Sequence, residues 1–97
     1  MEISGSTFIV TGAASGLGAA TTEMLVAAGA RVVIADRDET ASAATAARLG
    51  EAVRFAPTDV TREEDGRAAV ALAISAFGAL HGLVNCAGVA PGEKVLG

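Results

Sequence analysis

The residues of this chain best suited to chemistry are three glycines, Gly12, Gly16 and Gly18, spaced four and two residues apart. They follow the apolar run at residues 8–10 and open a segment of helical pattern that reaches residue 28. Such glycines let a backbone turn sharply off a strand, approach a diphosphate and pack a helix against the sheet. The N–H groups at the helix start attract an anion, and the Ser15 hydroxyl and Leu17 N–H can donate to it. The pattern predicts a dinucleotide phosphate loop; the alternative is a tight turn that binds no ligand.

A second candidate binding residue, Asp36, ends the apolar run at residues 32–35, eighteen residues after Gly18. An acidic residue about 20 residues beyond such a loop holds the adenosine ribose of a dinucleotide. A carboxylate accepts hydrogen bonds from both ribose hydroxyls and repels a 2′-phosphate, so Asp36 favours NAD over NADP. Alternatively, Asp36 is a helix cap or turn residue. Asp38 is the better cap for the next helix, which would leave Asp36 free for a ligand.

Apolar runs and helical patterns alternate along the chain. The predicted strands cover residues 7–11, 31–35, 52–56 and 82–85, and the predicted helices cover residues 17–28, 39–49 and 62–77. Repeated strand-helix-strand units imply right-handed crossovers and a parallel sheet. We therefore expect an α/β fold with a Rossmann-type, doubly wound parallel sheet in the strand order 3-2-1-4. Residues 1–97 would form the N-terminal part of a single dinucleotide-binding domain.

Glycine and capping patterns mark the predicted helix ends. Gly29, Gly50 and Gly78 each follow a helix, where a left-handed C-cap suits glycine. Thr61 and Glu64 have the spacing of a capping box ahead of the third helix. The acidic run at residues 63–65 is then explained by the electrostatics of a helix N-terminus rather than by catalysis.

Composition is typical of an α/β protein and excludes several classes. Hydrophobic residues make up 52% of the chain, aromatic residues 3%, and the formal net charge is −4. The basic residues are scattered, so we expect neither nucleic acid nor a membrane as a partner. No apolar run is long enough for a signal or a membrane span, and a single cysteine precludes an internal disulfide, which favours a cytoplasmic location. The only histidine, His81, has no partners at metal-ligand spacing, so we expect no metal site.

Four parts of the sequence together resemble the short-chain dehydrogenase/reductase family. They are the Thr-Gly-x-x-x-Gly-x-Gly pattern at residues 11–18, Asp36, Asp59 with Val60, and the Asn-Cys-Ala-Gly stretch at residues 85–88. The resemblance, which runs from about residue 7 to residue 89, implies the fold given above and NAD as the cofactor. In the stretch at residues 85–88 this sequence departs from the family's commoner Asn-Asn-Ala-Gly form, because Cys86 stands in the second position.

The resemblance implies further cofactor contacts. The Asp59 carboxylate would accept from the adenine amino group, and the Val60 N–H would donate to the adenine ring. The stretch after the fourth strand would line the cofactor's sugars; its members are Asn85, Cys86, Ala87 and Gly88. For three residues a structural role is the alternative: a turn residue for Asp59, a brace between strands for Asn85, and a small buried apolar residue for Cys86.

The resemblance implies an oxidoreductase that transfers a hydride between NAD and a secondary alcohol or ketone. Residues 13–18, 55–61 and 84–88 are most similar to the 3-hydroxyacyl-CoA and hydroxysteroid dehydrogenases of the family, which implies an acyl-CoA or steroid substrate. The family's catalytic groups are Ser, Tyr and Lys; this chain has no Tyr, and its sole lysine, Lys94, follows the last predicted strand. We therefore expect no catalytic residue before Gly97, a C-terminal segment that completes the enzyme, and a homo-oligomer, as a tetramer, in the complete protein. The alternative is a stand-alone, non-catalytic NAD-binding or regulatory module.

Overall fold

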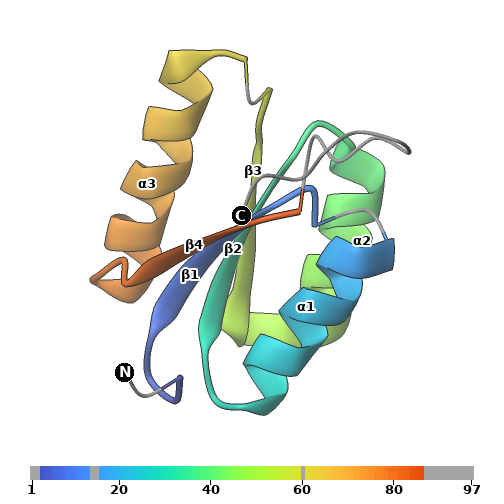
Figure 1. Ribbon diagram of the computed structural model, residues 1–97, viewed down its shortest axis with the longest axis vertical. Coiled ribbons are helices and arrows are strands. Elements are labelled where there is room, and N and C mark those ends of the chain that lie inside the picture. Colours follow the sequence, from blue (N-terminus) through green and yellow to red (C-terminus); the bar gives the residue numbers. More distant parts are fainter. Residues whose placement is uncertain (1–2, 14–15, 60, 87–97) are drawn as a thin grey trace, which may run out of the picture.

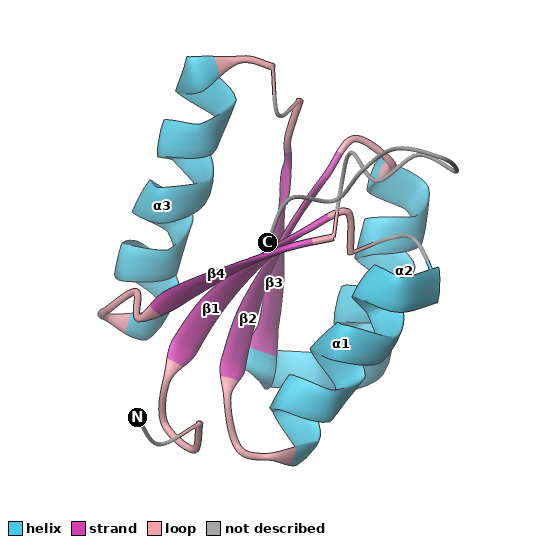
Figure 2. Ribbon diagram, viewed as in Figure 1, coloured by secondary structure: helices cyan, strands magenta, loops and turns pink. Residues whose placement is uncertain are grey.

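The computed structural model describes residues 3–13, 16–59 and 61–86. Its elements are β1 (Thr7–Thr11), α1 (Gly16–Ala27), β2 (Arg31–Asp36), α2 (Glu39–Leu49), β3 (Val53–Pro57), α3 (Glu63–Phe77) and β4 (Gly82–Asn85). The four strands form one parallel sheet in the order β3-β2-β1-β4 (Figure 1). Figure 2 shows α1 and α2 on one side of this sheet and α3 on the other. The predicted α/β class, doubly wound sheet and strand order are confirmed.

Element boundaries agree with the sequence prediction to within one residue. β1, α2 and β4 have the predicted bounds, whereas α1 begins and ends one residue early, β2 runs on to Asp36, and α3 begins one residue late. β3 is displaced by one residue because a 3-10 turn (Gly50–Ala52) follows α2 and takes Ala52 out of the strand. The predicted left-handed cap is wrong at Gly50, whose φ is 78° but whose ψ is −147°, and confirmed at Gly78, with φ 83° and ψ −10°.

The two central strands carry the core on both faces, which explains their nearly continuous apolar sequences. Beneath α1 and α2, alternate residues of β1 and β2 pack with Leu25 of α1; these strand residues are Phe8, Val10, Val32 and Ile34. On the opposite face, Ile9, Val33 and Ala35 pack against Ala69 and Ala73 of α3. Of the outer strands, β3 buries only Val53 and Ala56, and β4 alternates between half-buried and exposed positions. The sheet therefore holds its central strands rigidly, and their carboxyl ends are fixed in position.

None of the helices in the described part of the chain has the length and apolar character needed to cross a lipid bilayer.

Candidate dinucleotide-binding site

The carboxyl ends of the four strands meet along one edge of the sheet. Thr11, the last residue of β1, lies in register with Asn85 at the end of β4 and with Ala35 in β2. Asp36 at the end of β2 pairs with Pro57 at the end of β3, and the Thr58 N–H donates to the Asp36 carbonyl at 2.9 Å. The structure thus brings the predicted site residues of four separate segments to the edge where ligands bind in open α/β sheets.

The three glycines of the loop have different structural roles. Gly12 has a φ of 69°, and its N–H donates to the Ala35 carbonyl at 3.1 Å, which anchors the turn to β2. Gly18 lets α1 pack closely, since a Cβ there would lie 2.1 Å from the Gly12 oxygen. At Gly16, in contrast, a Cβ would meet no atom of the described residues within 4 Å, apart from its own helix and chain neighbours. Gly12 and Gly18 are therefore required by the fold, whereas the space at Gly16 is open to a ligand.

The start of α1 presents an electropositive end next to this loop. Gly16 and Leu17 are exposed, and the first turn of α1 contains no acidic residue. The positive end of the helix dipole therefore meets no carboxylate from the helix's own first turn. An anion of suitable shape is the kind of ligand that such a helix end attracts. Ser15, the predicted donor from a side chain, lies outside the described residues.

Asp36 is half-buried at the end of β2, and its Oδ1 accepts from the Asp38 N–H at 2.8 Å. The turn into α2 uses the Asp36 carboxylate to order its backbone, as in the turn role considered for this residue, and its availability to a ligand stays a prediction. The predicted cap is confirmed: Asp38 is the N-cap of α2 and accepts from the Ala41 N–H at 3.0 Å. The bond from Asp38 fixes the orientation of the Asp36 carboxylate at the edge of the sheet.

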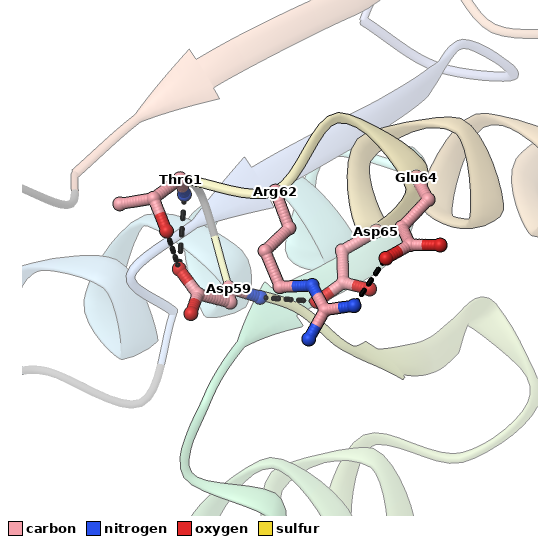
Figure 3. A network of polar contacts seen from close by, with 5 residues as sticks. All are labelled: Asp59, Thr61, Arg62, Glu64 and Asp65. Carbon is pink, nitrogen blue, oxygen red and sulfur yellow. Dashed lines mark hydrogen bonds and ion pairs between the residues drawn. The ribbon is translucent and has the colours of Figure 1, made fainter.

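Asp59 organises the turn between β3 and α3 (Figure 3). Its Oδ1 accepts from the Thr61 N–H at 2.9 Å and from the Thr61 hydroxyl at 2.6 Å. These two bonds, the side-chain bond first, lower the pKa of Asp59 below its usual 3.8, with smaller contributions from the positive charges of Arg37 and Arg62. The Asp59 N–H donates to Oδ2 of Asp65 at 2.9 Å. Asp59 is thus held as a charged, oriented acceptor, and the turn role considered from the sequence is confirmed.

The predicted capping box at the start of α3 is wrong. The N-cap is Arg62, whose side chain makes no capping bond, and Glu64 pairs with Arg62 instead of reaching back to Thr61. The Thr61 hydroxyl donates to the Asp59 carboxylate and does not cap the helix. The residue that reaches back is Asp65, the third of the helix. The ion pair with Glu64 raises the pKa of Arg62, which remains charged beside the turn.

Asn85 and Cys86 close the β1 and β4 end of the site. The Thr11 hydroxyl donates to Oδ1 of Asn85 at 2.7 Å, and the Cys86 N–H donates to the Thr11 carbonyl at 2.9 Å. Asn85 therefore braces neighbouring strands, which is the structural role considered for it from the sequence. Cys86 is half-buried and packs against the core beneath α1 and α2, in agreement with the packing role considered for it. Ala87 and Gly88, like Val60, lie outside the described residues.

Two residues of this edge were missed from the sequence, Thr11 and Asp65. The signal for Thr11 is a threonine at the end of a strand whose neighbouring strand ends in asparagine. The signal for Asp65 is an acidic residue at the third position of a helix, where the side chain often bonds to the backbone N–H before the helix. In the described part of the chain, no three histidine, cysteine, aspartate or glutamate side chains are grouped to hold a metal ion. The edge thus combines an exposed helix start with carboxylate, hydroxyl and amide groups.

A comparison with family models identifies the architecture that carries this edge. The model of the short chain dehydrogenases matches residues 6–96. The chain belongs to the short-chain dehydrogenase family. The sequence resemblance is therefore confirmed, and the match includes every part of the site described above.

Individual family members are similar to the chain in sequence. Human 3-hydroxyacyl-CoA dehydrogenase type-2 is 46% identical over 93 residues, which cover 96% of this chain and 36% of the human protein. A 2,5-dichloro-2,5-cyclohexadiene-1,4-diol dehydrogenase of Sphingobium indicum is 48% identical over 89 residues, 91% of this chain and 35% of that protein. The chain thus spans about a third of the length of these curated relatives.

Solved structures agree. The 3-hydroxyacyl-CoA dehydrogenase type-2 of Mycobacterium avium superimposes with a TM-score of 0.82 at 40% identity, over 88% of this chain and 33% of that chain. A short chain dehydrogenase/reductase of Burkholderia phymatum in complex with NAD gives a TM-score of 0.81 at 37% identity, over 86% of this chain and 31% of that chain. A 3-ketoacyl-(acyl-carrier-protein) reductase of Brucella melitensis complexed with NADH gives 0.80 at 36% identity, over 84% and 34%.

Proposed function

We propose that this chain forms the NAD-binding part of a short-chain dehydrogenase, and that residues 1–97 are the N-terminal part of a single dinucleotide-binding domain. The observation that carries the proposal is the Asp36 carboxylate, oriented by Asp38 at the same edge as the glycine loop. The open space at Gly16 and the acid-free start of α1 fit a diphosphate. NAD, when bound, supplies the nicotinamide ring that accepts or donates the hydride.

The residues of the edge divide the cofactor among them. The glycine loop and the start of α1 would hold the diphosphate, through Gly12, Ser15, Gly16, Leu17 and Gly18. Asp36 would accept from the ribose hydroxyls, Asp59 from the adenine amino group, and the Val60 N–H would donate to the adenine ring. The end of β4 would lie along the remaining sugar, through Asn85, Cys86, Ala87 and Gly88. The Asp59 carboxylate is suited to its role because its lowered pKa keeps it an acceptor.

The complete enzyme would transfer a hydride between NAD and a secondary alcohol or ketone, with 3-hydroxyacyl-CoA or a hydroxysteroid as the substrate class. Relatives carrying the name 3-hydroxyacyl-CoA dehydrogenase type-2 support this choice. The catalytic Ser, Tyr and Lys would come from a C-terminal segment, since this chain has no Tyr. Assembly into a homotetramer and a cytoplasmic location remain predictions.

Titration with NADH and NADPH, followed by nucleotide fluorescence, tests the cofactor assignment. We expect NADH to bind at least tenfold more tightly, because in NADPH the Asp36 carboxylate would face a phosphate with about two negative charges. Asp36→Ala should shrink this ratio chiefly by weakening NADH, by about 1.5–3 kcal/mol, the value of a hydrogen bond to a charged group.

Asp38→Ala is the matched control, because it removes a carboxylate two residues away that caps α2. It should lower stability by about 1 kcal/mol and leave the NADH to NADPH ratio unchanged. Equal affinities, or tighter NADPH binding, would contradict the assignment. NADH formation from a 3-hydroxyacyl-CoA by the complete polypeptide would exclude the binding-only module, and better turnover of sugars or polyols would overturn the substrate class.

A further inference from the structure

A hollow of about 400 Å³ lies at the amino ends of β2 and β3, opposite the edge that carries the candidate dinucleotide site. Figure 1 shows α3 running antiparallel to the strands, so that its last turn lies near their amino ends. The residues that line the hollow come from β2, from the 3-10 turn and β3, and from the end of α3; they are Arg31, Glu51, Ala52, Arg54, Ala76 and Phe77. We call it the arginine hollow.

The two arginines of this hollow point to the same face of the sheet as α3. Arg54 is the register partner of Val33, whose side chain packs against α3, and Arg31 lies two residues before Val33 on β2. Register partners, and every second residue of a strand, share one face of a sheet. The guanidinium carbons of Arg31 and Arg54 lie 5.8 and 5.7 Å from the centre of the Phe77 ring. Both positive charges are therefore held around one aromatic ring at the end of α3.

Neither arginine has a carboxylate oxygen within 4 Å in the part of the chain that the structure describes. The ion pairs found there use three other arginines, Arg48, Arg62 and Arg67. Arg54 donates from Nη1 to two backbone carbonyls, at 2.9 and 3.0 Å, and these acceptors carry no formal charge. An arginine has five N–H donors in a planar fork, so bonds from one nitrogen leave Arg54 with donors for a ligand. Arg31 is exposed and contacts Phe77 through its guanidinium.

Glu51 is the acidic residue among those that line the hollow. It is exposed on the 3-10 turn ahead of β3, and its carboxylate forms no ion pair with Arg31 or Arg54 in the described structure. The lining thus carries two positive charges and one negative charge, on a chain whose formal net charge is −4. A local excess of positive charge in a concave site attracts an anion.

We propose that the arginine hollow binds a phosphate group, either the free ion or one carried by a small organic ester. A phosphate monoester has a charge of about −1.5 to −2 at pH 7 and three strong acceptor oxygens. It therefore matches two guanidinium forks better than a carboxylate, which has one negative charge and two oxygens. The hollow also has room for the body of an ester beside Phe77, since a water molecule in the liquid occupies only about 30 Å³. The proposal does not depend on NAD binding.

Isothermal titration calorimetry of the complete polypeptide with inorganic phosphate, at constant ionic strength, tests this site. NADH is present throughout, so that a dinucleotide rather than phosphate fills the glycine loop. Arg31→Gln should weaken phosphate binding about tenfold or more, because it removes a charge-assisted fork from the hollow. Arg48→Gln is the matched control, since it removes the same charge from an exposed ion pair with Glu23. It should change the affinity for phosphate by less than about twofold, because salt screens distant surface charges.

Glu51→Gln adds a result that a purely structural role of the arginines does not predict. Removing its negative charge from the hollow should tighten phosphate binding by about twofold. Glycerol 3-phosphate, titrated in the same way, distinguishes the sources of the phosphate group. Tighter binding than that of inorganic phosphate assigns the site to an ester, and equal or weaker binding assigns it to the free ion; either result supports the proposal.

Three outcomes would overturn the proposal. The first is that inorganic phosphate shows no saturable binding. The second is that Arg31→Gln and Arg48→Gln change its affinity equally, and the third is that Glu51→Gln weakens it. A failure of NADH to bind would count against the proposed function alone, because the comparison of Arg31→Gln with Arg48→Gln does not involve the glycine loop.

Discussion

The two ends of the parallel sheet are made from the same four strands, but their polar groups are held in different ways. At the amino end, the Thr7 N–H donates to Nδ1 of His81 at 2.9 Å, and the His81 N–H donates to the Thr7 carbonyl at 2.8 Å. At the carboxyl end, Asp36 and Asp59 each bond to backbone only two residues away. The amino end is thus closed by a contact between distant segments, whereas most carboxylate bonds at the other end order local turns.

A second feature of the amino end strengthens the contrast. The guanidinium carbons of Arg31 and Arg54 lie 5.8 and 5.7 Å from the centre of the Phe77 ring, which joins β2, β3 and α3. At the carboxyl end, the side-chain bond between distant segments is the one from the Thr11 hydroxyl to Asn85, and it joins two neighbouring strands. The amino end therefore contributes mainly to stability, while the carboxyl end holds oriented polar groups at an open edge of the sheet. Substitutions at the two ends should therefore separate stability from NADH binding.

The largest effect is expected within the carboxyl end itself, where two glycines two residues apart have opposite roles. Gly18→Val should destabilise the fold by about 3 kcal/mol or more, because the new Cβ would lie 2.1 Å from the Gly12 oxygen and 2.5 Å from the Ala13 Cα. Gly16→Val should change stability by no more than about 0.5 kcal/mol, since its Cβ would meet no atom of another described segment within 4 Å, but should abolish NADH binding by filling the proposed diphosphate space. Urea unfolding and NADH titration measure the two effects. Equal losses of stability would contradict the assignment of Gly18 to helix packing and of Gly16 to ligand binding.

At the amino end the expected effect is smaller and confined to stability. His81→Ala leaves the nearly buried Thr7 N–H without its acceptor, which should lower the free energy of unfolding by about 1–2 kcal/mol. His81→Asn supplies an oxygen that can accept from the same N–H and should recover at least half of the loss. Neither substitution should change the affinity for NADH. A change in affinity as large as that of Asp36→Ala would mean that the two ends are coupled.

The sequence predicts most of the fold because local and global signals agree in it. Continuous apolar runs such as residues 32–35 identify central strands, and their alternation with helical patterns leads to the observed strand order. Glycine spacing and Asp36 locate the candidate site. The sequence does not predict which short polar side chain bonds to the backbone of a turn. Thr61, Glu64 and Asp65 all fit a helix start, and the position of Asp59 decides which of them bonds to the backbone ahead of α3.

Contacts between distant segments also cannot be predicted from the sequence. A lone histidine with no metal partners gave no reason to expect that His81 would accept from Thr7, 74 residues away. The hollow between α3 and the strands β1 and β4, lined by residues such as Ile9, Val70 and Leu83, likewise cannot be predicted from the sequence of α3, because it exists only once β4 lies beside β1. Register and face are three-dimensional properties, and they become visible only in the folded sheet.

The smallest effect concerns the charge of Asp59 at the carboxyl end. Its pKa is lowered in the folded protein by the two bonds from Thr61, so ionised Asp59 stabilises the fold above its unfolded value of 3.8. That contribution should disappear as the pH falls from 3.8 through the lower pKa of the folded state. Asp59→Asn keeps an oxygen that accepts from Thr61 but does not titrate. The wild-type protein should therefore lose more stability than Asp59→Asn between pH 5 and acid conditions, and the gap between their unfolding free energies should close toward low pH. A gap that stays constant over this range would show that the Thr61 bonds do not favour the charged form, and Asp59 would then be an ordinary exposed acid in the turn.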